Sequence, residues 1–249
     1  LMSTQVAPAL AAVSHGTSNP AGQAVVSRLI EDVAAAARNQ NLDAEVRLGH
    51  VDVQDPDVAA TLADLPEGTP AVIVPVLLSA GYHVHVDLRE ETADVGRDVT
   101  IGGALGPDDR LVELLVQRLE EAGAEPSRDT IILGVAGSSD AAAVEDCYEM
   151  GRRLAARLGS EVGVAFLAAA HPSVAEAVVA AKDLTRQAGQ GRVVVASYLL
   201  APGYFQGLLE KADADITTTP LLPAPGDIER PPASPEELVE IILDRYRHG

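Results

Sequence analysis

Residues 11–22 read AAVSHGTSNPAG, an apolar run that ends at a histidine, a glycine and hydroxyl side chains. A second stretch, residues 133–142, reads LGVAGSSDAA and has Ala136 where the first has His15. An apolar run followed by a small-residue turn is typical of a strand that leads into a helix in α/β proteins. The sequence therefore predicts that one structural unit occurs twice in this chain.

A second pair of segments supports the duplication. Residues 74–85 read VPVLLSAGYHVH, and residues 196–207 read ASYLLAPGYFQG. Both are apolar strands followed by a Gly-Tyr pair, and Phe205 replaces His83 directly after that pair. The histidine is again missing from the second copy.

A third pair lies between the other two. Residues 50–59 read HVDVQDPDVA, and residues 166–175 read FLAAAHPSVA, so that Ala168 replaces Asp52. Matched positions are about 120 residues apart in every pair. A fold tolerates the loss of a functional side chain better than the loss of its core pattern, so the missing groups indicate chemistry. The candidate site residues are His15, Asp52 and His83.

Length and composition fit two domains. The chain has 249 residues, 47% of them hydrophobic and only 3% aromatic. Cores built from Val, Leu, Ile and Ala are typical of buried parallel strands. From the repeat we expect one domain over residues 1–124 and a second over 125–249, joined in EAGAEPSR near residues 121–128.

Alternating strand and helix patterns predict an α/β fold with two similar doubly wound parallel sheets. In the first half, strands are expected at 9–14, 45–53, 71–78 and 99–104, and helices at 21–39, 57–65, 86–95 and 108–122. In the second half, strands are expected at 130–135, 162–168, 192–200 and 216–221, and helices at 141–158, 174–188, 204–212 and 235–246.

Charge and cysteine content exclude several classes of function. The formal net charge of −19 argues against nucleic acid as a partner and favours cations. The single cysteine, Cys147, excludes an internal disulfide and a cysteine-ligated cluster. No segment is apolar enough to span a membrane, and the start LMSTQVAPALAAV lacks the features of a secretory signal, so we expect a cytoplasmic protein.

The three candidate residues are expected at one edge of the first sheet. Each lies at or just beyond the end of a strand, and ligands of open parallel sheets bind beyond the carboxyl ends of the strands. Two imidazoles and a carboxylate suit Fe(II), Co(II), Ni(II) or Zn(II). Three ligands leave positions open for exchange, and imidazole also accepts protons near neutral pH. We expect His85 to be a further candidate ligand. His50 is either an auxiliary ligand or a surface residue, and we favour the surface residue. His171 and His248 are expected to be exposed.

The segments SHGTSNP, VDVQDPDV and VPVLLSAGYHVHVDL together resemble the class II chelatases that metallate sirohydrochlorin. In that family a His-Gly-Ser/Thr follows the first strand, an acidic residue stands a few positions before a proline, and a Gly-x-His-Val follows the third strand. The resemblance covers the whole first half, and the second half resembles the same module without its ligands. GPDDRLVELLVQRL at 106–119 resembles the closing helix of the module.

The resemblance implies a lyase-type chelatase in which His15 and His83 bind the incoming metal, Fe²⁺ before Co²⁺, and accept the pyrrole protons. Asp52 would assist, and a supporting or proton-relay role is favoured over direct coordination, because Asp is one methylene shorter than the Glu that the family commonly has there. No organic cofactor is implied. The tetrapyrrole substrate is a polycarboxylate, for which the expected binding residues are Gly16, Thr17, Ser18, Gly81, Tyr82 and Arg89. The rim at 200–204 of the second half would form a second wall for the ring, which favours a monomer.

Two other functions use the same residues. A carrier of metal or tetrapyrrole would need the same ligands without turnover. A histidine-type phosphohydrolase would need an arginine beside the nucleophilic histidine, and Ser14 stands at that place.

Overall fold

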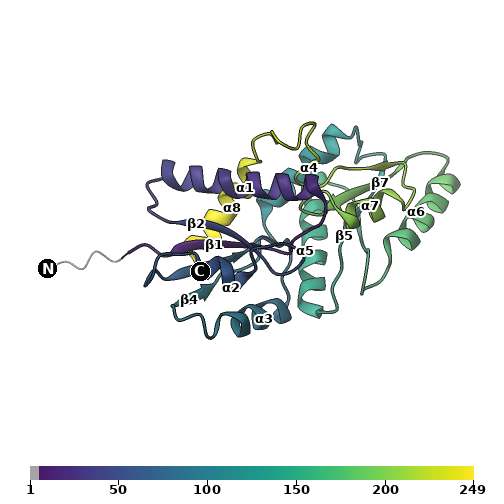
Figure 1. Cartoon of the computed structure of the whole chain (residues 1–249). Coiled ribbons are helices and arrows are strands. Elements are labelled where there is room, and N and C mark those ends of the chain that lie inside the picture. Colours follow the sequence, from purple (N-terminus) through teal and green to yellow (C-terminus); the bar gives the residue numbers. More distant parts are fainter. Residues whose placement is uncertain (1–5) are drawn as a thin grey trace. The chain divides into compact units, whose positions relative to one another are not determined.

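The computed structural model describes residues 6–249, which form two compact units (Figure 1). Unit 1 consists of the chain up to Leu105 together with Gly226–Gly249, and unit 2 consists of Gly106–Pro225. Each unit contains one four-stranded parallel sheet with helices on both faces. The expectation of an α/β fold with two similar doubly wound sheets is confirmed.

Unit 1 begins with a strand and helix whose bounds follow local sequence signals. The side chain of Asn19 accepts a hydrogen bond from the Gly22 N–H, and Pro20 occupies the first helical position. The elements of unit 1 are β1 (Ala9–Ser14), α1 (Pro20–Asn39), β2 (Val46–His50), α2 (Val58–Ala63), β3 (Ala71–Pro75), α3 (Tyr82–Thr92), β4 (Val99–Ile101) and α8 (Glu236–Arg247).

The strand order of unit 1 is β2-β1-β3-β4, and every neighbouring pair is parallel. The chain leaves β1 toward β2 on one side and then crosses to β3 on the other side. The loops after β1 and β3 therefore diverge, which is the position where open parallel sheets bind ligands. Both candidate histidines follow these two strands.

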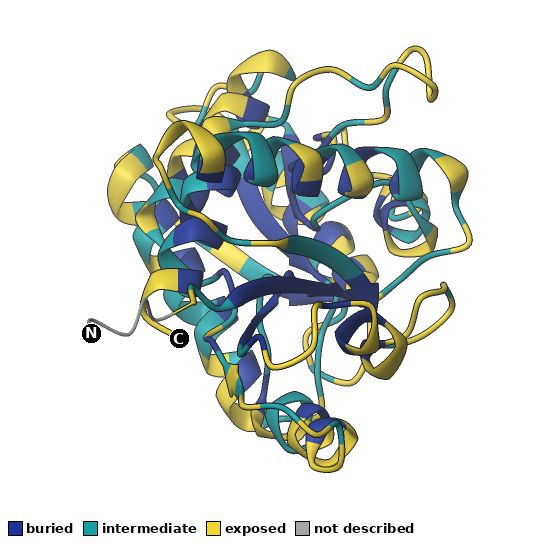
Figure 2. Cartoon of the chain, turned by 60° about the vertical axis from the view of Figure 1, so that its left-hand side comes forward, coloured by how far each residue is buried: buried dark blue, intermediate teal, exposed yellow. Residues whose placement is uncertain are grey.

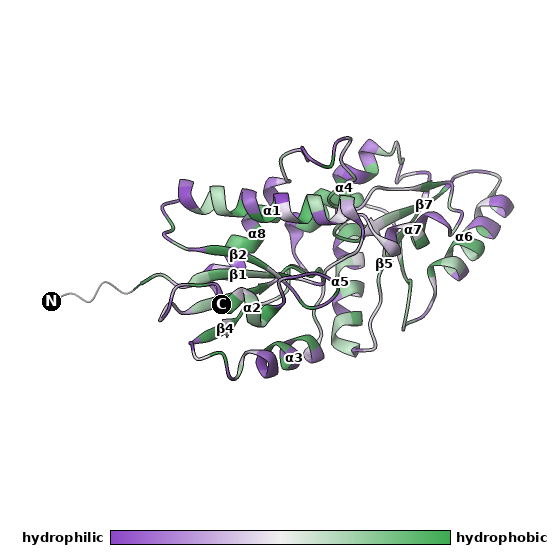
Figure 3. Ribbon diagram, viewed as in Figure 1, coloured by the Kyte–Doolittle hydropathy of each residue, from purple (hydrophilic) through white to green (hydrophobic). Residues whose placement is uncertain are grey.

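The core of unit 1 is aliphatic, as the composition predicts. All six residues of β1 and all five of β3 are buried. Figure 2 shows dark blue strands between helices with exposed outer surfaces, and Figure 3 shows hydrophobic, green residues both on strands and on parts of the helices. The residues of one fully buried cluster are Ala9, Ala11, Val13, Val58, Leu62, Leu65, Ala71, Ile73 and Leu88.

Unit 2 repeats this architecture with the strand order β6-β5-β7-β8. Its helix α6 has a complete capping box between Ser173 and Glu176, and it ends at Gly189 in the left-handed conformation. The elements are α4 (Asp109–Glu121), β5 (Thr130–Val135), α5 (Ala141–Leu158), β6 (Val162–Phe166), α6 (Val174–Ala188), β7 (Val193–Tyr198), α7 (Tyr204–Glu210) and β8 (Ile216–Thr217).

The compact units differ from the halves 1–124 and 125–249 expected from the repeat. Helix α4 follows the last strand of the first repeat, but it packs against α5 and β7 in unit 2. Helix α8 ends the second repeat, but it packs against α1 and β3 in unit 1. The two repeats have thus exchanged their closing helices, and the apolar face of each covers the other sheet.

Polar contacts fix each exchanged helix in its unit. The guanidinium of Arg118 in α4 donates from Nη2 to the carbonyl of Leu221 over 2.8 Å. Arg245 in α8 donates to the carbonyls of Ala104 and Leu105 over 2.8 and 2.9 Å. In both units an arginine of the closing helix thus donates to main-chain carbonyls in the segment that follows the last strand of the sheet, β4 or β8.

Several expected strands are shorter in the structure. The strand expected at 45–53 ends at His50, and the one expected at 216–221 ends at Thr217. The helix expected at 86–95 begins four residues earlier, at Tyr82. Among residues 6–249, no helix is long and apolar enough to cross a membrane. Residues 1–5, which belong to the expectation about a secretory signal, lie outside the described part of the chain.

Candidate active site

His15 directly follows β1, and its side chain is exposed at the carboxyl edge of the unit 1 sheet. The next residue, Gly16, has a φ of +93°. A Cβ atom at Gly16 would lie 2.0 Å from the main-chain oxygen of Asp52. Only glycine therefore allows the His15 loop to approach the Asp52 turn this closely.

Asp52 lies beside His15 because the pairing of β1 and β2 continues past the strands. The Asp52 N–H donates to the His15 carbonyl over 3.0 Å, and the Val51 N–H donates to the Ser14 carbonyl over 2.9 Å. The exposed carboxylate of Asp52 also accepts a hydrogen bond from the Val53 N–H over 2.8 Å. The carboxylate is thus oriented by its own turn.

The Asp52 turn has a strained backbone. Val53 has a φ of +67°, and the Gln54 N–H donates to the Asp52 carbonyl over 2.7 Å, which makes a γ-turn centred on Val53. A β-branched residue at positive φ is a conformational outlier, and such outliers gather at functional sites. Val53 also leaves 60% of its surface exposed.

His83 lies in the first turn of α3, at the edge where β3 ends. The ring of Tyr82 packs edge-on against the His83 imidazole with the ring centroids 6.0 Å apart. Because the segment is helical and not extended, His83 and His85 are separated by about 200° around the axis and point to different sides. His85 therefore does not share a face with His83.

Neither the expected set of His15, Asp52 and His83 nor the additional candidate His85 forms a three-ligand metal site. Among residues 6–249, no three His, Cys, Asp or Glu side chains stand close enough together to hold a metal ion. The divergence of His83 and His85 on α3 explains why the latter does not join the set. Two imidazoles, His15 and His83, remain at the edge between β1 and β3.

His50 is buried, with 4% of its surface exposed, so the expectation of a surface residue was wrong. Its Nδ1 lies 2.7 Å from Oγ of Ser14, the residue opposite it in the register of β1 and β2. Burial lowers the pKa of His50, and the negative charge of Asp55 opposes this effect only in part. The partner of His50 lies 36 positions away in the chain, so no local pattern could predict this contact.

His171 and His248 are exposed, as expected. Ser14 stands where a histidine phosphohydrolase would need an arginine, and its neutral hydroxyl is buried against His50.

The residues expected to bind the substrate differ in their burial, their distance from His83 and the availability of their N–H groups. Gly81 caps α3 and is buried, whereas the side chain of Tyr82 is 71% exposed. Arg89 lies in the last turn of α3, about 9 Å along the helix axis from His83. Gly16 and Ser18 lie in the loop after His15, but the N–H of Thr17 is already bound by the side chain of Gln54 over 2.9 Å. Thr17 therefore does not offer this N–H to an anion.

Acidic side chains surround the helix that carries His83. The pKa of Glu91 is raised, first by burial and then by the charges of Asp87 and Asp57. Asp87 lies one helical turn after His83. This negative potential favours an approaching cation and opposes the carboxylates of a polyanionic ligand.

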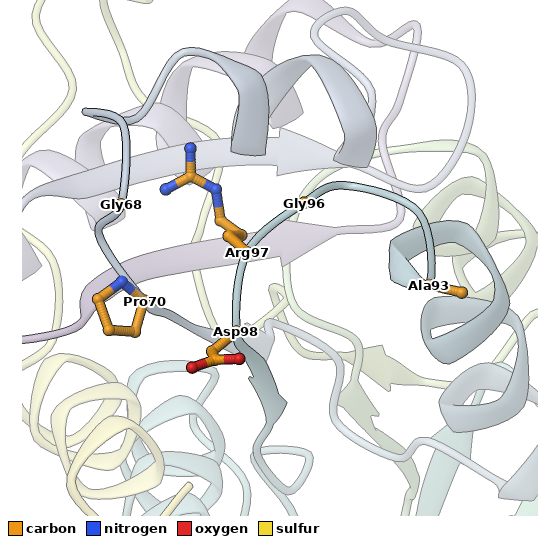
Figure 4. A pocket seen from close by; sticks show the side chains of 6 residues that line it. All are labelled: Gly68, Pro70, Ala93, Gly96, Arg97 and Asp98. Atoms are coloured by element: carbon orange, nitrogen blue, oxygen red, sulfur yellow. The ribbon is translucent and has the colours of Figure 1, made fainter.

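A cavity of about 400 Å³ lies elsewhere in unit 1, at the turns that precede β3 and β4 (Figure 4). Arg97 extends toward the turn at Gly68 and donates to the carbonyls of Leu65, Pro66 and Thr69. These bonds close the turn after α2. The cavity is at the opposite edge of the sheet from His15 and His83.

Unit 2 repeats the backbone of the site without its ionisable groups. The Ala168 N–H donates to the Ala136 carbonyl over 3.0 Å, as Asp52 does to His15. Ala169 has a φ of +62° where Val53 has +67°. The rings of Tyr204 and Phe205 pack edge-on at 5.7 Å in the place of Tyr82 and His83.

Two glutamines at the site were not expected from the sequence. Gln54 binds the Thr17 N–H, and the side chain of Gln23 donates to the Thr17 carbonyl over 2.7 Å. The available signal was the repeat itself, since Val144 and Ala170 stand at the matching positions of the second copy.

Comparisons with known proteins identify a family that matches both repeats. The family model CbiX matches residues 9–122 and again residues 130–218. A sirohydrochlorin ferrochelatase of Priestia megaterium is 31% identical over 157 residues, which cover 60% of this chain and 58% of the relative. The aligned part thus spans less than two thirds of that relative.

Solved structures show the same fold. SirB from Bacillus subtilis with Fe³⁺ matches with a TM-score of 0.77 and 20% identity, covering 97% of this chain and 94% of that one. The sirohydrochlorin chelatase SirB from Bacillus subtilis subspecies spizizenii in complex with cobalt matches with a TM-score of 0.73 and 17% identity, again covering 97% and 94%. With the family model matched in both halves, the chain belongs to the CbiX family of class II chelatases.

Proposed function

We propose that this protein is a sirohydrochlorin chelatase that inserts Fe²⁺ or Co²⁺ into the macrocycle, with Fe²⁺ as the first choice. The observation that carries the proposal is the paired backbone of the two repeats. Unit 2 keeps the strand ends, the Gly137 turn and the γ-turn of unit 1, but it lacks His15, Asp52 and His83. Side chains lost from an unchanged backbone are those that the fold does not need.

The reaction exchanges two pyrrole protons for one divalent cation, which is a substrate here and not a resident cofactor. His15 and His83 lie after neighbouring strands, where the loops diverge, and each offers one imidazole nitrogen to the cation. Two imidazole ligands leave coordination positions for water and for the pyrrole nitrogens. A cation held by few ligands leaves readily, which transfer to the ring requires.

Proton removal uses the same side chains. Once the cation has passed to the ring, the neutral imidazoles of His15 and His83 accept the pyrrole protons. Asp52 stands beside His15 through the bond between their main chains, and its carboxylate stabilises the imidazolium that forms. We assign Asp52 this supporting role and not direct coordination.

Substrate binding uses the exposed apolar and aromatic groups at the edge of unit 1. Tyr82 offers a ring face beside His83. We assign the carboxylates of the macrocycle to the N–H groups of Gly16 and Ser18, in the loop after His15, and to the positive charge of Arg89 on α3. We further propose a monomer without organic cofactor, in which the two repeats share one chain.

The test follows the absorbance of sirohydrochlorin mixed anaerobically with Fe²⁺ or Co²⁺. We expect His15→Ala and His83→Ala each to lower kcat/KM at least about a hundredfold, since loss of a group acting in acid–base catalysis costs 10²–10⁴-fold. His171→Ala is the matched control, because His171 is an exposed histidine of unit 2. Wild-type metallation no faster than in buffer would refute the proposal and indicate a carrier instead.

A further inference from the structure

The main chain of Thr17 is held from two sides by glutamine side chains. Gln23, on the first turn of α1, donates from Nε2 to the Thr17 carbonyl over 2.7 Å. Gln54, in the γ-turn beside Asp52, accepts from the Thr17 N–H over 2.9 Å. We call this pair of side chains the glutamine clamp. Thr17 lies two residues after His15, so the clamp holds the loop that carries the first imidazole.

The clamp joins three parts of the site. Gln23 fixes the loop to a regular helix, and Gln54 fixes it to the turn that carries the Asp52 carboxylate. Thr17, Gln23 and Gln54 are each half-buried. Loops after strands are the more mobile parts of α/β domains, and two additional hydrogen bonds restrict this one.

The second repeat serves as an internal comparison. Val144 stands at the position of Gln23, four residues after the helix cap in both repeats, and Ala170 stands at the position of Gln54. Neither side chain has a hydrogen-bonding atom. The γ-turn nevertheless persists, since the Ala170 N–H donates to the Ala168 carbonyl over 2.8 Å. The turn therefore does not need the glutamine in order to form.

We propose that Gln23 and Gln54 are positioning residues for His15, an inference that rests on the proposed chelatase function. They occur only in the repeat that has the imidazoles, and they contact the main chain of the His15 loop. Transfer of a cation to a ring requires an imidazole held to within a fraction of an ångström, because a misplacement of about 1 Å costs about a hundredfold in rate. The clamp supplies this restraint without touching the cation.

The chemistry of the clamp predicts an asymmetry between the two glutamines. Gln54 acts as an acceptor toward an N–H, and a glutamate carboxylate also accepts. Gln23 acts as a donor toward a carbonyl, and a carboxylate cannot donate. Gln54→Glu should therefore keep the clamp, whereas Gln23→Glu should break it and place a negative charge against an oxygen.

The experiment uses the full-length protein and the variants Gln23→Met, Gln54→Met, their combination, Gln54→Glu and Gln23→Glu. Methionine keeps the length of the side chain and removes the amide. Gln40→Met is the matched control, because Gln40 also makes side-chain hydrogen bonds but lies at the other end of α1. The measurements are kcat and KM for metallation, the affinity for Co²⁺ without macrocycle, the exchange rate of the Thr17 amide proton, and the unfolding midpoint.

We expect each methionine variant to lower kcat about tenfold while KM for the macrocycle changes less than about twofold. The combined variant should lose little more than either one, since both side chains hold one peptide group. The Thr17 amide should exchange faster in Gln54→Met and return to the wild-type rate in Gln54→Glu. Gln54→Glu should also recover kcat, whereas Gln23→Glu should not.

Equal kcat in wild type and in both methionine variants would overturn the proposal. So would a loss of kcat that follows the unfolding midpoint, or a Gln54→Glu variant as slow as Gln54→Met. The Co²⁺ affinity separates this inference from the proposed function. If wild type does not metallate the ring, a weaker Co²⁺ affinity in the methionine variants, matching that of His15→Ala, still supports positioning of His15, and an unchanged affinity refutes it.

Discussion

The N–H of Asp52 donates to the carbonyl of His15 over 3.0 Å, and Ala168 makes the same bond to Ala136 over the same distance in the second repeat. One pair carries a carboxylate and an imidazole, and the other carries two methyl groups. The arrangement of the site therefore belongs to the backbone, and its chemistry belongs to side chains added to it.

The close approach of Gly16 to Asp52 makes Gly16→Ala strongly destabilising. The new Cβ would lie 2.0 Å from the Asp52 oxygen at a φ of +93°. We expect a loss of at least about 2 kcal/mol in the free energy of unfolding, measured by denaturant titration. Gly68→Ala is the control, because Gly68 has a φ of +77° but no neighbour within 4 Å. It should lose only about 1 kcal/mol, and equal losses would show that the clash is relieved.

Buried His50 should make stability depend on pH. Its folded-state pKa is lowered by burial, so below the ordinary value of 6.5 the unfolded chain binds a proton that the folded chain excludes. The contribution of the neutral imidazole is complete above pH 6.5 and decreases as the pH falls through the folded-state pKa. Denaturant titrations between pH 5 and 8 should show this slope, and it should be smaller in a variant without His50.

Exchange of the Ser14–His50 pair for its apolar counterpart should be tolerated. Val135 and Phe166 occupy the matching positions in unit 2. His50→Phe alone leaves the buried Ser14 hydroxyl without its partner and should cost about 1–3 kcal/mol. The double variant Ser14→Val with His50→Phe should recover most of that loss, because the polar pair is replaced as a whole. A double variant less stable than the single one would contradict this expectation.

The preserved backbone of unit 2 should accept the missing ligands. We expect Ala136→His, Ala168→Asp and Phe205→His, introduced into the His15→Ala, His83→Ala background, to restore binding of Co²⁺, followed by its visible absorption. Ala168 is exposed, so its replacement should change the free energy of unfolding by no more than about 0.5 kcal/mol. Absent Co²⁺ binding in a folded variant would show that the two edges differ in more than these side chains.

Local signals predicted most helices well. The bounds expected for α5 and α6 match the structure, because Asp140 and Ser173 cap their starts and Gly159 and Gly189 end them. The start of α3 was missed because Gly81 has no side chain with which to cap a helix. That error matters for the site, since it decides that His83 and His85 diverge.

Contacts between segments that are distant in the chain could not be predicted from the sequence patterns. The repeat pointed to His15, Asp52 and His83, but the burial of His50 depends on Ser14 across the sheet. The glutamine clamp likewise joins residues 17 and 54, which meet only through the pairing of β1 with β2. The exchange of α4 and α8 was hidden for the same reason, because a repeat in sequence says nothing of which sheet a helix covers.

Because of that exchange, each repeat depends on a helix of the other repeat to complete its core. A polypeptide cut between Gly123 and Glu125 would leave each fragment with one bare sheet face and one orphan amphipathic helix. We therefore expect either fragment alone to be less stable than the intact chain, because each would expose apolar surface that the other half covers.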